Sequence, residues 1–159
     1  MPQPGFFGLD DRFAKLDGIG DPLVMIRAVV DWEGFRPILE AVQAKPRRSA
    51  AGRKAFDAVL LFRILALQQL YNLSDDQTEY QIRDRYSFSR FVDLTPEDVV
   101  PDAKTLWRFR ASLKSAAVFD QLFAELAREI AAEGDVARMR QIIDASLGAA
   151  RSSSMRVRK

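Results

Sequence analysis

The stretch FDAVLLFRILALQQLY, residues 56–71, decides the fold, because it is the most apolar segment of the chain. Its apolar residues lie on almost every side of a helical projection. A helix of that kind is buried all round. The sequence therefore predicts a central helix that the other elements surround.

Two shorter helices are predicted on the N-terminal side of this segment. Asp21 followed by Pro22 is a good helix start, since aspartate caps a first turn and proline suits the first helical position. A second helix is expected after Asp31, over residues 32–42, with Pro37 either in its first turn or at a kink. Its apolar side consists of Phe35, Ile38, Leu39 and Val42.

Three further helices are predicted within residues 74–113. The first begins with the capping-box pair Ser74 and Gln77, and the short stretch SFSRF follows it. The third begins after Asp102, and it has an apolar face and a basic face. The apolar face holds Leu106, Phe109 and Leu113, and the basic face holds Lys104 and Arg108. The order and size of the three helices resemble a helix-turn-helix element whose third helix reads DNA.

A last helix is predicted over residues 119–133, where Gly134 stops it. Its apolar stripe is interpreted as core, with a partner interface as the alternative. The stripe consists of Phe119, Leu122, Phe123, Leu126 and Ile130.

The segment QIIDASL, residues 141–147, is short and β-prone, and it predicts a strand. A lone strand leaves its backbone groups unpaired, so it is expected to open a second domain that this chain does not contain. The predicted fold is mainly α. Its parts are an N-terminal arm at 1–20, a helical domain at 21–134, the strand region at 135–147 and a basic tail at 148–159.

The composition excludes several kinds of chemistry. The chain has 159 residues, 48% of them hydrophobic and 29% charged, which is typical of a globular protein. No apolar run approaches the roughly 18 residues of a membrane helix, and the N-terminus lacks the pattern of a signal peptide. With neither Cys nor His, the chain is expected to use only carboxylates for a metal, such as Mg²⁺ or Mn²⁺.

The net charge says little about partners, but local clusters say more. Residues 145–159 carry four basic residues and no acid, so a net charge of +2 leaves −2 for residues 1–144. The linker at residues 45–54 is basic and contains Pro and Gly, which suits a loop that follows a phosphate backbone. A plain solvated surface is the alternative. The candidate DNA-binding residues are Arg47, Arg48, Arg53, Lys54, Lys104, Arg108 and Arg110. Trp107 and Phe109 are interpreted as core, with contact of Trp107 to the DNA backbone or bases as the alternative.

Several stretches in this order resemble bacterial transposases of the insertion-sequence-five group. They include PGFFGLDDRFAKL, VDWEGFRPIL, LYNLSDDQTEYQIRDRYSFSRF, VPDAKTLWRFR and IIDASL. The resemblance implies a helical domain that binds terminal inverted repeats, followed by a ribonuclease-H-like α/β domain. It also implies an Asp-Asp-Glu triad that binds two Mg²⁺ or Mn²⁺ ions. Asp144 matches the first carboxylate as a catalytic and metal residue, and nothing in the chain matches the other two.

The sequence therefore leaves more than one function open. The first is the DNA-binding part of a truncated transposase, expected to be inactive as an enzyme on its own. The alternatives are a helical module or inhibitor that pairs with intact transposase, and a nonfunctional remnant. The expected partners are DNA and a homodimer or heterodimer partner, with no membrane. The resemblance places the protein in the bacterial cytoplasm, at the nucleoid when bound to DNA.

Overall fold

The computed structural model describes residues 7–44 and 54–132, and its regular structure there is entirely helical. This confirms a mainly α fold for that part of the chain. The elements in order are α1 (Phe7–Ile19), α2 (Pro22–Val29), the 3₁₀-helix η1 (Trp32–Phe35), α3 (Arg36–Gln43), α4 (Ala58–Tyr71), α5 (Asp75–Asp84), α6 (Tyr86–Val92), α7 (Ala103–Ser115) and α8 (Phe119–Ala132).

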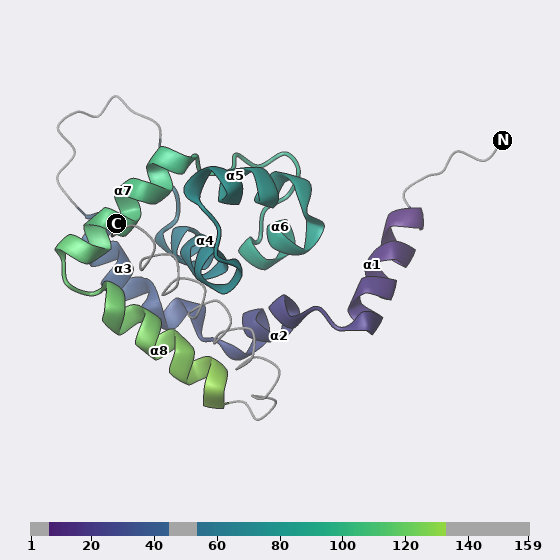
Figure 1. The fold of residues 1–159 in the computed structure, drawn as a ribbon, viewed down its shortest axis with the longest axis horizontal. Coiled ribbons are helices and arrows are strands. Elements are labelled where there is room, and N and C mark those ends of the chain that lie inside the picture. The colour runs from purple at the N-terminus through teal and green to yellow at the C-terminus, as the bar shows by residue number, and fades with distance from the viewer. Residues whose placement is uncertain (1–6, 45–53, 133–159) are drawn as a thin grey trace, which may run out of the picture.

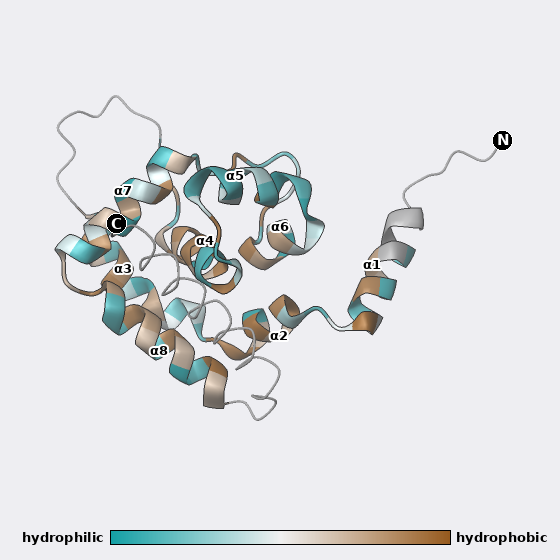
Figure 2. Cartoon of the chain, in the orientation of Figure 1, coloured by the Kyte–Doolittle hydropathy of each residue, from teal (hydrophilic) through white to brown (hydrophobic). Residues whose placement is uncertain are grey.

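Helix α4 is the centre of the fold, as the sequence predicts. Ten of its fourteen residues are buried, and η1, α3, α5, α6 and α7 pack around it (Figure 1). Asp57 caps its start by accepting a hydrogen bond from the Leu60 backbone N–H, at 3.1 Å. Asn72 ends it in the left-handed conformation, at φ 51°. Figure 2 shows the hydrophobic residues concentrated on α4, while α5 is largely hydrophilic.

The predicted helix starts are confirmed. Asp21 accepts from the Leu23 N–H at 2.9 Å, and Pro22 occupies the first position of α2. Ser74 and Gln77 form both hydrogen bonds of a capping box, each at 3.1 Å. Such signals are local, and for this reason they can be read from sequence.

The helix predicted after Asp31 is divided into two elements. Asp31 caps η1 rather than an α-helix, and Pro37 lies in the first turn of α3. Phe35 and Leu39 are buried, whereas Ile38, which was placed on the same apolar side, is 39% exposed. The apolar side is narrower than predicted because residue 38 lies about 100° from residue 39 around the helix axis.

The stripe of α8 belongs to the core. Leu122, Leu126 and Ile130 are buried, and Phe119 and Phe123 pack against the core. The ring centres of Phe62 and Phe123 lie 5.4 Å apart. The interpretation of this stripe as core is confirmed. The stripe is not exposed, so it does not offer the alternative partner interface.

Helix α1 is an element that the sequence did not predict, since residues 1–20 were interpreted as an arm. It projects from the body of the molecule and joins α2 through a short connection (Figure 1). Gly20, at φ 90°, ends α1, and its N–H donates to the carbonyls of Leu16 and Asp17 at 3.3 and 3.2 Å.

Other predictions fall on residues that the structure does not describe. The predicted strand, the basic tail and the helix stop at Gly134 lie within residues 133–159, outside the described ranges. Among the described residues, no helix is long and apolar enough to cross a membrane.

Candidate nucleic-acid interface

Helix α7 brings two of the predicted DNA-binding residues to an exposed surface. Asp102 caps the helix by accepting from the Thr105 N–H at 2.8 Å, and hydrogen bonds from Thr105 lower the pKa of the Asp102 carboxyl. The buried face consists of Leu106, Phe109 and Leu113. Lys104 and Arg108 lie one turn apart on the exposed side, so the predicted division between the two faces is confirmed.

Trp107 lies on the exposed side of α7. The interpretation of Trp107 as core is wrong, because its residue is 60% exposed, whereas Phe109 is 5% exposed. The reason is angular: Leu106, Phe109 and Leu113 together span about 60° around the helix axis, and Trp107 lies about 100° beyond Leu106, which is at the edge of this stripe. The helical spacing of the sequence contained this signal, since Trp107 does not share the three- and four-residue spacing of the stripe.

Arg110 turns toward the interior and binds α5 and α4. Its guanidinium contacts the Asp75 carboxylate at 2.7 and 2.9 Å and donates to Oε1 of Gln68 at 3.0 Å. Gln68 in turn donates to Asp75 at 2.7 Å. The hydrogen bond from Arg110 is the main cause that lowers the pKa of Asp75. Arg110 was predicted to contact DNA, but in this structure its donors hold α7 against α5.

A second contact fixes the start of α7. Glu79 of α5 accepts a hydrogen bond from the Ala103 N–H at 3.2 Å and also pairs with Arg83 at 3.5 Å. Together with the Asp75–Arg110 pair, this contact ties α5 to α7 at two points. The exposed face of α7 is therefore presented by a supported helix.

A hollow of about 420 Å³ adjoins this face and brings in a third predicted residue. Lys54, the last residue of the basic linker, lines it together with Arg108. Thr105 and Ser112 of α7 add hydroxyl groups to the lining. Gln43 donates to the Phe56 carbonyl at 2.9 Å, which holds together the two chain segments that flank the linker. Arg47, Arg48 and Arg53 lie outside the described residues.

The connection between α6 and α7 is longer than the turn of a compact helix-turn-helix. It covers residues 93–102, whereas that motif has a turn of about three or four residues. Asp98 folds it locally by accepting from the N–H and hydroxyl of Thr95 at 2.7 and 2.9 Å. Val100 and Pro101 are buried, which anchors its end before Asp102. Helix α5 packs against both α6 and α7.

The metal site that the resemblance implies depends on Asp144 in a full-length context, and the described residues do not test it. No group of three or more acidic side chains within 7–44 and 54–132 is placed to hold a metal ion. Asp144 lies outside those ranges. A pair of divalent ions needs several carboxylates, so the described part of the chain does not form such a centre by itself.

Residues 10–112 match the family model described as Transposase domain (DUF772). The chain belongs to this transposase-domain family. The match extends from α1 into the last turns of α7, and so includes the supported helix with its basic face. No solved structure matches the chain. Membership gives the domain a transposase-related role and suggests DNA as a partner.

Proposed function

We propose that this transposase-family domain binds DNA through the exposed face of α7 and the hollow beside it. The observation that carries the proposal is the convergence of Lys54, Lys104 and Arg108 with exposed Trp107 around one surface. These residues come from two distant parts of the sequence. The fold supports them by ion pairing and capping, and it leaves their own donors exposed.

The charge of α7 suits a polyanion. The helix, over Ala103–Ser115, contains four basic residues and no acid. Arg110 is paired with Asp75, and Nζ of Lys114 lies 5.0 Å from the ring centre of Phe119. Lys104 and Arg108 make no ion pair with any residue that the structure describes. They are therefore the cations of α7 best placed to neutralise phosphates.

Trp107 adds a different contact on the same face. An exposed indole beside cations offers a flat apolar surface that can pack against a deoxyribose or against the methyl group of a thymine in a groove of the duplex. In this proposal, Lys104, Arg108 and Lys54 hold the backbone, and Trp107 contacts the bases or sugars.

The resemblance to the insertion-sequence-five group makes the proposal more specific. The DNA would be the terminal inverted repeats of the element, with α5, α6 and α7 as a helix-turn-helix variant that has a long second connection. Asp144 would be the first carboxylate of the Asp-Asp-Glu centre for Mg²⁺ or Mn²⁺. We place the activity of the chain in the bacterial cytoplasm, at the nucleoid.

Binding to a fluorescently labelled duplex, followed by anisotropy over a range of salt concentrations, tests the proposal. Lys104→Ala with Arg108→Ala should lower affinity for every sequence and reduce the slope of log K against log salt by about two. Trp107→Ala should weaken binding with little change in that slope. Arg128→Ala is the matched control, since Arg128 is an exposed cation that pairs with Glu125 on α8.

Two results would contradict the proposal. One is an unchanged affinity and slope in the double variant. The other is an equal loss in Arg128→Ala, because that would indicate a general charge effect. Comparison of the inverted-repeat duplex with a scrambled duplex then tests the finer claim, since a specific binder prefers its own site by about a thousandfold or more.

A further inference from the structure

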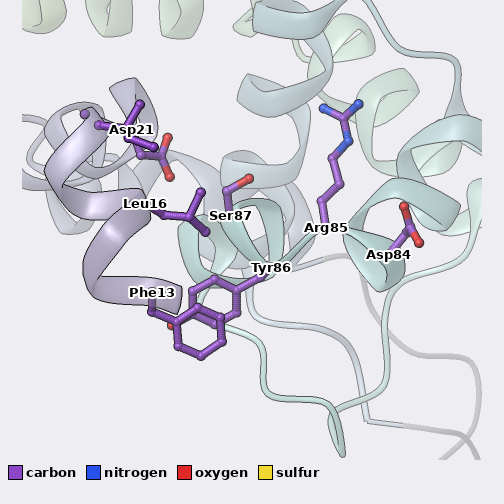
Figure 3. A pocket seen from close by; sticks show the side chains of 9 residues that line it. Phe13, Leu16, Asp21, Asp84, Arg85, Tyr86 and Ser87 are labelled. Atoms are coloured by element: carbon purple, nitrogen blue, oxygen red, sulfur yellow. The ribbon is translucent and has the colours of Figure 1, made fainter. Parts of the chain in front are cut away.

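Helix α1 exposes apolar side chains beside an open hollow at the junction of α5 and α6. Ile19 is 81% exposed and Leu16 is 40% exposed, although both are large aliphatic residues. The hollow has a volume of about 550 Å³. Phe13, Leu16 and Ile19 of α1 line one side of it, and residues 84–87 line the other (Figure 3). Covering such residues removes apolar area from water, and this contributes favourable free energy to binding.

The attachment of α1 to the body leaves this apolar side uncovered. The rings of Phe13 and Tyr86 are stacked, with their centres 3.5 Å apart. The Asp17 carboxylate pairs with the Arg90 guanidinium at an N–O distance of 2.7 Å. These contacts fix the position of the helix beside α6. Figure 1 shows α1 standing away from the other helices, so much of its surface faces solvent.

The charges around the hollow are complementary to the charges on α1. Asp11 and Lys15 lie one turn apart on α1, and both are exposed. Asp84 and Arg85 form the opposite rim, and both are also exposed. None of the four makes an ion pair with another residue that the structure describes. The chain thus presents an acid and a base on the helix, and an acid and a base on the rim.

We propose that α1 of a second copy of this chain docks in the hollow, in a reciprocal two-fold arrangement. Leu16 and Ile19 of each copy would enter the hollow of the other copy. Asp11 would then face Arg85 of the second copy, and Lys15 would face Asp84 of the second copy. A two-fold interface uses the same patch on both subunits, so it requires a self-complementary surface. A second copy is the occupant because both halves of the contact, apolar and charged, occur on one chain.

This interface does not use the exposed face of α7. Its test therefore needs no DNA, and its outcome is independent of the proposed DNA binding. The tested protein is the full chain.

Sedimentation equilibrium from about 1 to about 200 µM measures the association directly. The wild-type chain should associate to a dimer in this range. Ile19→Asp should raise the dimer Kd by at least about tenfold, because it places a carboxylate in an apolar contact. Val99→Asp is the matched control: Val99 is 51% exposed and lies in the loop before α7, so its substitution should leave the Kd unchanged. A wild-type chain that stays monomeric, or an Ile19→Asp variant with an unchanged Kd, would overturn the proposal.

A charge exchange tests the predicted register of the dimer. Asp11→Arg and Arg85→Asp should each weaken association severalfold, and the double variant should recover affinity toward the wild-type value. Circular dichroism verifies that each variant keeps its helices. A double variant that is as weak as the sum of the two single variants would overturn the pairing of Asp11 with Arg85.

Discussion

Arg108 and Arg110 are two residues apart on α7, and their surroundings differ. They point about 200° apart around the helix axis, so one faces solvent while the other faces α5. Arg110 meets Asp75, which lies 35 residues earlier in the chain, at 2.7 Å. Sequence spacing places both arginines outside the buried stripe. It does not reveal which of them has a partner, because that depends on how α5 and α7 pack.

The Asp75–Arg110 pair makes stability depend on pH. Arg110 lowers the pKa of Asp75 in the folded protein below its usual value near 3.8. The unfolded chain therefore takes up the proton first as the pH falls, and the folded state loses this stabilisation. The contribution of this pair to the free energy of unfolding should be complete above about pH 5 and decline below about pH 4. We expect Asp75→Asn to lower the free energy of unfolding by about 2 kcal/mol at pH 7, and by less at pH 3. Urea unfolding at pH 3 to 7 measures this difference.

Asp76→Asn is the matched control for this measurement. Asp76 is the next residue of α5, is exposed, and makes no ion pair with a described residue. Its variant should follow the wild-type pH profile. Wild-type and Asp75→Asn profiles that stay parallel down to pH 3 would show that the pair does not couple protonation to folding.

At the scale of elements, the helix caps were predictable from the sequence, but the way in which each helix packs against its neighbours was not. Asp21, Ser74 and Asp102 act within three residues of themselves, so their roles follow from the local sequence. Helix α1 was missed although its apolar residues Phe13, Leu16 and Ile19 follow a helical three-residue spacing. Trp107 was assigned to the core on the basis of residue type, although its position relative to Leu106 indicates exposure. The hollow that joins Lys54 to Arg108 depends on tertiary packing.

The cap of α7 gives a prediction at this scale. Asp102→Ala removes the oxygen that accepts from the Thr105 N–H, so it should destabilise the protein by about 1 kcal/mol. Asp102→Asn keeps an acceptor at the same place and should cost much less. Urea unfolding at pH 7 measures both changes. Glu97→Ala, an exposed position in the preceding loop, should change stability by less than about 0.5 kcal/mol. Equal stability of Asp102→Ala and wild type would argue against a stabilising cap.

At the scale of the whole molecule, one core joins elements from α2 to α8. Its buried residues extend from Leu23 to Ile130 and form a single cluster. Trp32 of η1 connects two helices of this core. Its ring centre lies 6.1 Å from that of Phe62 on α4 and 5.6 Å from that of Phe91 on α6. Arg27 of α2 also reaches Asp93, 66 residues later, at 3.1 Å. No local pattern in the sequence reveals contacts over such separations.

A single core predicts cooperative unfolding. Trp32 is 3% exposed, and the chain has two tryptophans, so Trp107→Phe leaves Trp32 as the one fluorescent indole. In that variant, the urea transition seen by Trp32 fluorescence should coincide with the transition seen by far-ultraviolet circular dichroism. The substitution itself should cost less than about 0.5 kcal/mol, because residue 107 is 60% exposed. Coincidence would identify a domain that folds as one unit and exclude a remnant that fails to fold. A fluorescence transition at a clearly lower urea concentration than the loss of helix would instead show that the core around Trp32 unfolds separately from the other helices.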